Sequence, residues 1–196
     1  MRALLLLPDR LFSWVEGFST PVMTTLARFI FAAVLLVYYV NSGFAKLGDG
    51  LSGLIFPGSG AYATIFPKAS EAVLYDVSQL TTFHYAVVLL GTWAEIILPV
   101  LVVIGLFTRA AAFGMIGFVI VQSLTDLFGH GGIAHSETLG VWFDRLADGA
   151  ILDQRSLWVF LLLYLVFKGG GPLSLDRFLL RSGMSPYQDD PQLSRG

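Results

Sequence analysis

The sequence predicts an all-α membrane protein, a bundle of four transmembrane helices with flanking amphipathic interfacial helices. Of the 196 residues, 55% are hydrophobic and only 13% are charged. Soluble domains usually carry about 25% charged residues. The apolar residues are also gathered into four long segments, separated by stretches that contain glycine, proline or charge. We therefore expect one helical unit that crosses a lipid bilayer.

Three of the apolar segments are long enough to cross a bilayer alone, because about 20 residues suffice at about 1.5 Å of rise each. The fourth would give only about 18 Å of helix. We expect this span to begin earlier, around residues 153–155. A tight connection at Thr108 and Arg109 joins the second span to the third. The four segments are residues 23–47, 82–107, 110–128 and 156–167.

Amphipathic pieces are predicted at both ends of the chain. Residues 11–18 gather apolar side chains on one face, which is typical of a helix lying at a membrane surface. Near the other end, Ser174 is placed to cap a short helix. The predicted organisation is an N-terminal interfacial helix (1–22), a four-span membrane domain (23–168), and a C-terminal interfacial helix with a disordered tail (169–196).

Lysine and arginine are unequally distributed between the two sides of this topology. With the N-terminus inside, eight basic residues lie on the inner side and four on the outer side, which agrees with the positive-inside rule. We predict a multi-pass membrane protein with both termini in the cytoplasm. The inner residues are Arg2, Arg10, Arg28, Arg109, Lys168, Arg177, Arg181 and Arg195, and the outer ones are Lys46, Lys68, Arg145 and Arg155.

Composition also excludes several classes of function. The chain has no cysteine, which removes disulfides, thiolate metal sites and CxxC redox centres. Electron transfer would therefore need a bound cofactor, a quinone or a partner protein. The net charge of −2 offers no broad basic face, so we expect no nucleic-acid partner.

Glu95 is the only charged residue within residues 85–107. An ionisable group inside the bilayer is costly, so it normally faces other helices or a cavity and has a partner. We predict that Glu95 lies near the middle of the membrane, as a proton relay or part of a polar pocket. The alternative is that Glu95 only locks helix packing through hydrogen bonds. The sequence leaves both open.

Five further polar residues are predicted to form an outer-facing funnel that ends at Glu95. Their positions on the first three spans suit one polar network, and Gln122 and Asp126 are four apart on a helix. The predicted network consists of Tyr38, Asn41, His84, Gln122 and Asp126.

Three basic residues at the ends of spans are interpreted as interface anchors: Arg28, Lys46 and Arg109. Arg28 is expected to reach lipid phosphate at the inner face. A buried ion pair between Arg28 and Glu95 is the alternative, and it would bridge about 11 Å of depth.

Asp126 and His130 are the candidates for a metal site, because they are four apart and would face one ion if the helix continued that far. Glycines 129, 131 and 132 favour an end of the helix there. We therefore predict that the chain has no metal site. If a metal does bind, Asp126 and His130 are its candidate ligands.

Several short motifs follow one another along the chain: Arg28, then GFAKL at 43–47, then Glu95, then GLFTR at 105–109, and finally GGGPLSLD at 169–176. In this combination the chain resembles the DoxX family of small four-helix bacterial membrane proteins. That family is named for a subunit linked to thiosulfate:quinone oxidoreduction, and some relatives associate with enzymes that handle oxidative or thiol stress. The resemblance implies a non-autonomous membrane subunit of a redox system. Quinone is the cofactor that it implies, and a membrane or periplasmic protein is the partner.

Two other classes of function stay open. In a small transporter or permeation module the polar funnel would be a path, and four spans would then call for a homo-oligomer. An assembly or anchoring protein would have no catalytic site. Whether the chain is an enzyme in its own right is left open; at most the residues suit an oxidoreductase-associated subunit.

Overall fold

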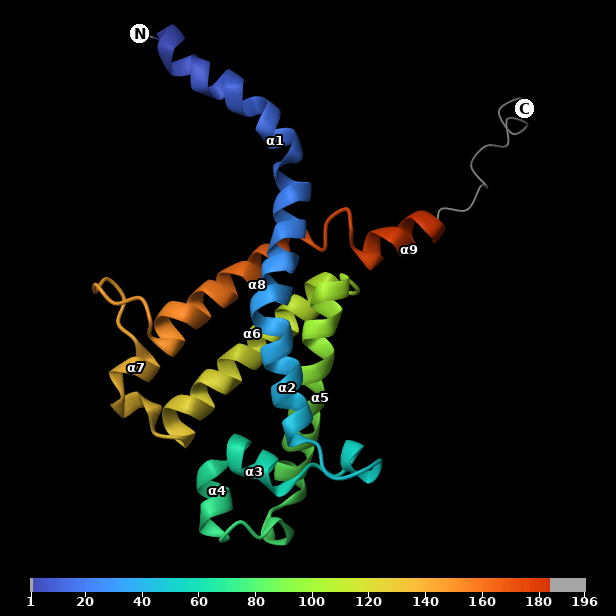
Figure 1. Ribbon diagram of the computed structural model, residues 1–196, viewed down its shortest axis with the longest axis vertical. Helices are drawn as coiled ribbons and strands as arrows, with labels where there is room; N and C mark the ends of the chain where they lie inside the picture. Colours follow the sequence, from blue (N-terminus) through green and yellow to red (C-terminus); the bar gives the residue numbers. More distant parts are fainter. Residues whose placement is uncertain (1, 184–196) are drawn as a thin grey trace, which may run out of the picture.

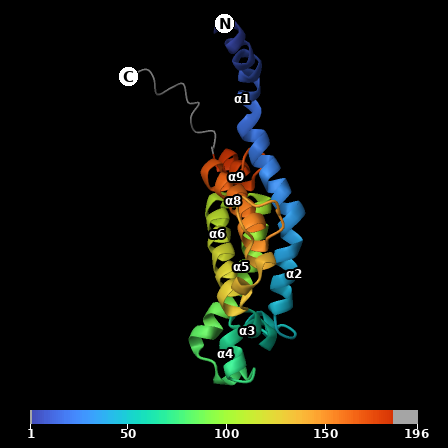
Figure 2. The ribbon, with the colours of Figure 1, turned by 90° about the vertical axis from the view of Figure 1, so that its left-hand side faces the viewer.

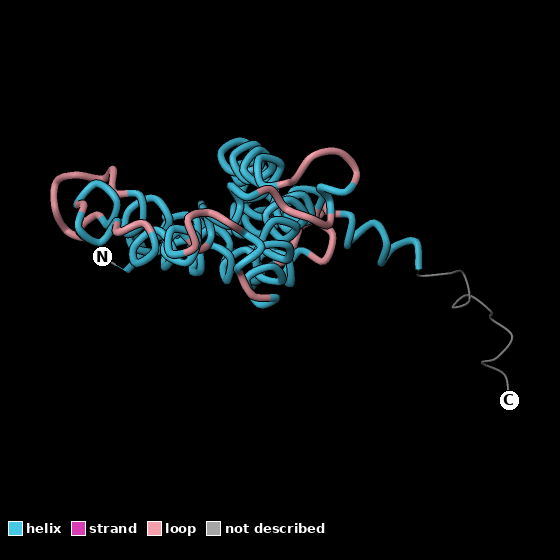
Figure 3. The backbone as a smooth tube through the Cα atoms, turned by 90° about the horizontal axis from the view of Figure 1, so that it is seen from below, coloured by secondary structure: helices cyan, strands magenta, loops and turns pink. Residues whose placement is uncertain are grey.

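The computed structural model describes the backbone of residues 2–183 and the side chains of residues 16–183. This part of the chain contains helices and connecting loops, with no strand (Figure 3). The helices, in chain order, are α1 (Arg2–Phe31), η1 (Ala32–Leu36), α2 (Val37–Lys46), η2 (Ser52–Leu54), α3 (Ser59–Ile65), α4 (Pro67–Ala72), η3 (Val77–Gln79), α5 (Thr82–Ile104), α6 (Thr108–Leu124), η4 (Thr125–Gly129), η5 (Gly132–Ala134), α7 (Ser136–Leu139), η6 (Ala150–Arg155), α8 (Ser156–Lys168) and α9 (Leu175–Gly183).

The predicted four-span helical architecture is confirmed. Within the described residues, four helices are long and apolar enough to cross a membrane, which indicates a multi-pass membrane protein. They are Glu16–Lys46, Thr82–Ile104, Thr108–Gly129 and Ala150–Lys168. The fourth span does begin before Ser156, in the π-helical segment η6.

The ends of the elements differ from the sequence prediction in two places. Thr108 and Arg109 belong to α6, so the tight connection is formed by residues 105–107. Gly105 ends α5 in the left-handed conformation (φ 72°), which suits a residue without a side chain. At the N-terminus, α1 runs without a break from Arg2 into the first span and bends away from the bundle (Figure 1). The proposed interfacial placement of residues 1–22 stays a prediction.

The four spans pack around one core, in which α5 contacts both α2 and α6, and α8 contacts both α6 and α1. Helix α2 lies beside α5, and α6 lies beside α8 (Figures 1 and 2). Between them the buried core consists mainly of aromatic and aliphatic side chains, with Tyr39 in edge contact with Phe118 and Trp158. Burying apolar surface away from water typically stabilises a fold by about 25 cal/mol per Å2. Helices that already lie in lipid are stabilised mainly by close packing against one another. The fully buried members include Phe31, Tyr39, Met115, Leu162 and Leu165.

One end of the bundle carries α3 and α4, and we call it the α3 end; the opposite end carries α9, and we call it the α9 end (Figure 1). At the α3 end a second small core joins Ala61, Tyr62 and Val88. The indole N–H of Trp93 donates to the carbonyl of Leu54 (2.9 Å). Together these contacts hold the α2–α5 connection against α5.

At the α9 end, helix termini are closed by side chains from other elements. The Asp176 carboxylate accepts hydrogen bonds from the backbone N–H groups of Phe107 (2.7 Å) and Thr108 (2.9 Å) at the start of α6. Ser174 Oγ accepts the N–H of Arg177 (3.3 Å), which confirms that Ser174 caps the short helix α9. The predicted disordered tail falls on residues 184–196, outside the described residues.

Candidate functional site

The centre of the candidate site is an ion pair between Lys46 and Glu95. Lys46 Nζ lies 2.6 Å from Glu95 Oε2, and the two residues are 9% and 2% exposed. Lys46 Nζ also contacts Ser42 Oγ (2.7 Å) and the Ser42 carbonyl (3.3 Å). Burying two charges costs several kcal/mol per ion unless the geometry and additional hydrogen bonds are good. Here the ammonium group has three acceptors, which satisfies its three donors.

The backbone brings these two residues together by close packing of α2 on α5. Gly43 lies against Ile96, so that a Cβ on Gly43 would come 2.4 Å from Ile96 Cγ1. This approach sets the last turn of α2 opposite the middle of α5. The Lys46 side chain then folds back along its own helix toward Ser42, because side chains in an α-helix point toward its N-terminus.

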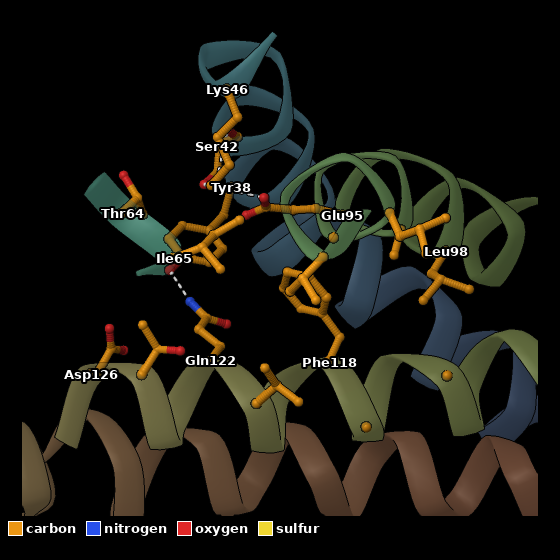
Figure 4. A pocket seen from close by; sticks show the side chains of 18 residues that line it. Tyr38, Ser42, Lys46, Thr64, Ile65, Glu95, Leu98, Phe118, Gln122 and Asp126 are labelled. Atoms are coloured by element: carbon orange, nitrogen blue, oxygen red, sulfur yellow. Dashed lines mark hydrogen bonds and ion pairs between the residues drawn. The ribbon is translucent and has the colours of Figure 1, made fainter. Parts of the chain in front are cut away.

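A cavity of about 560 Å3 opens beside this pair, enclosed by α2, α3, α5, α6 and η4. Figure 4 shows Lys46, Ser42 and Glu95 on one wall, and Gln122 and Asp126 on the facing helix. The polar lining residues are Tyr38, Ser42, Lys46, Thr64, Glu95, Gln122, Thr125 and Asp126.

The remaining lining of the cavity is apolar, and part of it is exposed on α5 and α6. Leu90 and Val121 line the cavity yet are 69% and 57% exposed, so they form an open rim on the lipid-facing surface. Gly117 also lines it, and no heavy atom lies within 4 Å of the position that a Cβ there would take. A cavity with a polar end and an apolar lateral mouth suits an amphiphilic molecule that enters from the bilayer.

Tyr38, Tyr39 and Gln122 form a hydrogen-bonded link across the cavity wall. Gln122 Nε2 donates to Tyr38 Oη (2.9 Å), as Figure 4 shows, and Tyr39 Oη donates to Gln122 Oε1 at 3.4 Å. The tyrosine rings are in edge contact, with centroids 4.9 Å apart. The Tyr38 hydroxyl therefore has a fixed position at the cavity.

A second ion pair lies at the end of the cavity nearest η4. Arg155 Nη2 lies 2.5 Å from Asp126 Oδ2, and Arg155 Nη1 donates to Ser123 Oγ (3.0 Å). Both partners of the ion pair lie in π-helical segments, Asp126 in η4 and Arg155 in η6. Such segments often accompany functional sites. Two ion pairs therefore lie at the polar side of the cavity, Lys46–Glu95 and Arg155–Asp126.

The predicted network is brought together only in part. Tyr38, Gln122 and Asp126 line the same cavity as Glu95. Asn41 is exposed and is not among the lining residues. His84 lies outside the cavity as well, because its ring accepts the N–H of Thr81 (3.3 Å) and so caps its own helix.

Two of the three residues predicted as interface anchors have other roles. Lys46 is paired with Glu95 and buried. Arg28 is 8% exposed, and its guanidinium donates to the carbonyls of Val102 (3.1 Å), Gly170 (3.0 Å) and Val103. It therefore neither reaches lipid phosphate nor pairs with Glu95, because the carbonyls at the end of α5 supply its acceptors. Arg109 is exposed at the start of α6.

The two candidate metal ligands are engaged separately. Asp126 pairs with Arg155, and His130 Nε2 lies 2.9 Å from the carbonyl oxygen of Thr64. Among the described residues, no group of three or more His, Cys, Asp or Glu side chains is arranged to hold a metal ion.

The sequence reasoning did not place Ser42, Lys46 and Arg155 in the site. A signal for Ser42 was available, because it lies one helical turn before Lys46. The sequence contained no signal for Arg155, because its pairing with Asp126 depends on how the third and fourth spans pack together.

No family model, no curated protein and no solved structure matches this chain. The case for a function therefore depends on the chemistry and geometry of the cavity.

Proposed function

We propose that this chain is a DoxX-like, non-autonomous membrane subunit of a redox system in a bacterial cytoplasmic membrane, and that its cavity binds a quinone. The observation that carries the proposal is the buried Lys46–Glu95 pair on the wall of a cavity with an apolar lateral mouth. A quinone has a flat polar ring with two carbonyl acceptors and an apolar tail. The ring suits the polar wall, and the tail suits the opening between α5 and α6.

The residues on the polar wall suit the two ends of such a ring. The Tyr38 hydroxyl accepts a hydrogen bond from Gln122, and the Ser42 hydroxyl accepts one from Lys46, so each keeps its own O–H to donate to a carbonyl oxygen. A quinone supplies two-electron chemistry, and its reduction takes up two protons. The short hydrogen bond from Lys46 to Glu95 places one donor and one acceptor side by side at this wall.

The sequence has no cysteine, which excludes a thiol pair or a thiolate-bound cluster as the electron source, and we assign that source to a partner protein. Support for a partner comes from the two long connections, from α2 to α5 and from η4 to η6, where several large apolar side chains are exposed. Leu51, Leu74 and Phe143 are among the most exposed hydrophobic residues described. Exposed apolar groups outside the spans are typical of protein contacts. With both termini cytoplasmic, this partner would lie on the periplasmic side.

The proposal is tested by the quinone content of the full chain purified from bacterial membranes in mild detergent. We expect the wild-type chain to retain quinone and the double variant Lys46→Met/Glu95→Met to lose it. Both charges are removed together, so that neither is left buried and unpaired. The matched control is Lys68→Met/Glu71→Met, which removes one exposed charge of each sign from α4.

Two results would contradict the proposal. One is a wild-type chain that retains no more quinone than the double variant. The other is a solute flux in liposomes that requires Lys46 and Glu95 while quinone has no effect, which would favour the transporter. Loss of quinone in both variants would point to a general effect of charge instead of the site.

A further inference from the structure

A second, larger cavity of about 1230 Å3 lies at the α9 end, far along the bundle from the Lys46–Glu95 pair. It is enclosed by the first part of α6, the end of α8, the glycine-rich turn after it, and α9. One face of α1, at Thr20, Pro21 and Thr24, completes the wall. None of the residues that line it also lines the first cavity.

The lining of this cavity is strongly basic. Four cations line it, together with Asp176 as the only acidic residue, which leaves 4 − 1 = 3 positive charges. Among the described residues, none of the four basic side chains takes part in an ion pair or donates a hydrogen bond. The Asp176 carboxylate is directed instead at the backbone of α6, through Phe107 and Thr108. The four cations are Arg109, Lys168, Arg177 and Arg181.

An apolar groove of about 510 Å3 continues from this basic cavity along α1. The two share Pro21 and Pro172. The groove is lined by side chains that are almost all apolar, including Val22, Leu26 and Phe29. A molecule that occupied both would have an anionic group at one end and a hydrocarbon chain at the other.

The depth of the cations also fits a lipid headgroup. Lys168 is the last residue of the fourth span, and Arg109 is the second residue of the third. Span ends lie where the hydrocarbon core meets the headgroup region. Helix α9 exposes Phe178 and Leu180 beside Arg177 and Arg181, as expected of a helix at a membrane surface.

We infer that this basic cavity binds the phosphate headgroup of an anionic phospholipid, with one acyl chain along the apolar groove on α1. Basic pockets between transmembrane helices recognise such headgroups by charge. The guanidinium groups of Arg177 and Arg181 suit bidentate contacts to phosphate oxygens. The site is independent of any ligand at the Lys46–Glu95 pair.

The test uses the full chain in nanodiscs of phosphatidylcholine that contain a minor fraction of phosphatidylglycerol or cardiolipin. Native mass spectrometry then measures how strongly each lipid stays bound to the protein. The variant is Arg177→Gln/Arg181→Gln, whose side chains are exposed and unpaired in the described structure, so that folding is preserved. The matched control is Lys68→Gln/Arg145→Gln, which removes two exposed positive charges away from α9.

We expect the wild-type chain and the control to retain the anionic lipid in preference to phosphatidylcholine. Each basic residue near an anionic surface contributes about 1 kcal/mol, which corresponds to about fivefold in affinity, so the α9 variant should lose about 25-fold. An unchanged α9 variant, or an equal loss in the control, would overturn the inference. Displacement of the lipid by millimolar inorganic phosphate would also overturn it, because the cavity would then recognise a free anion.

Discussion

Gly43 on α2 packs directly against Ile96 on α5, at the level where Lys46 meets Glu95. A Cβ on Gly43 would lie 2.4 Å from Ile96 Cγ1 and 3.4 Å from the Thr92 carbonyl oxygen, so this approach needs a residue without a side chain. Small residues at helix contacts allow backbones in membranes to come close. The ion pair at the cavity thus depends on a glycine one turn away.

The first prediction concerns this contact. We expect Gly43→Ala to lower the free energy of unfolding by about 1–3 kcal/mol, the usual cost of overpacking. Unfolding in mixed micelles with increasing dodecyl sulfate measures the change. Ile96→Ala in the Gly43→Ala background should restore part of the loss. Gly60→Ala serves as the control, because it lies in open space on α3; an equal loss there would contradict the explanation.

The second prediction compares the loss of one partner of the Lys46–Glu95 ion pair with the loss of both. Lys46→Met leaves the Glu95 carboxyl buried without its partner, and we expect the free energy of unfolding to fall by about 3–5 kcal/mol. The double variant Lys46→Met/Glu95→Met should unfold close to wild type, because replacing both charges by apolar groups is often neutral. If the loss in the double variant equals the sum of the losses in Lys46→Met and Glu95→Met, the two side chains act independently and the pairing is wrong.

Arg28 is the subject of the third prediction. Its planar guanidinium donates to three backbone carbonyls that belong to α5 and to the turn after α8. Lysine keeps the charge but not the fork of donors, so Arg28→Lys should cost about 1.5–3 kcal/mol of unfolding free energy. Arg109→Lys, on the exposed start of α6, should change it by less than about 0.5 kcal/mol. Equal effects of the two variants would show that only charge matters.

The fourth prediction is a pH dependence that comes from Asp176. Burial alone would raise the pKa of its carboxyl, but the hydrogen bonds from Thr108 and Phe107, with the charge of Arg28, hold the pKa below its ordinary value of 3.8. A carboxyl with a lowered pKa in the folded state stabilises the fold at pH values above its unfolded pKa. That stabilisation is lost as the pH falls below about 4 through the folded pKa.

We therefore expect Asp176→Asn to lower the unfolding free energy by about 1 kcal/mol at neutral pH, as for loss of a helix cap. The difference from wild type should shrink as the pH falls below about 4, because the wild-type carboxyl is then protonated too. Unfolding curves measured from pH 7 to acid provide the test. A difference that stayed constant down to the lowest pH would mean that the charge of Asp176 contributes nothing.

The sequence was sufficient to predict the four spans and the extension of the fourth, because runs of apolar residues determine helix length in a bilayer. The same reasoning set Glu95 apart as an unusual charge, and the structure places it beside a cavity. Its partner was missed, because counting depth by helical rise placed Lys46 at the outer surface. The structure turns the lysine side chain back toward Ser42, where it reaches Glu95.

Two other residues show where sequence reasoning ends. Asn41 was expected in the pocket because it is polar within a span, yet it lies on the exposed face of α2. Periodicity gives the spacing of faces along one helix but not which face meets which neighbour. His84 lay within reach of local reasoning, since Thr81 three residues earlier predicts a cap at the start of α5. The role of Arg28 could not be predicted, because it depends on tertiary contacts with α5 that no local sequence pattern indicates.

The lateral mouth of the cavity offers the most direct test that it holds a quinone. Gly117→Leu adds a bulky side chain at the mouth, where no heavy atom lies within 4 Å of the position that its Cβ would take. Binding of a short-chain benzoquinone to the full chain in nanodiscs is measured for this variant, for the wild type and for Ala33→Leu, which adds the same group to an exposed position on the first span. Plugging the mouth should raise the Kd by about tenfold, a loss of about 1.4 kcal/mol, with Ala33→Leu unchanged. The same Kd for Gly117→Leu as for the wild type would contradict the account.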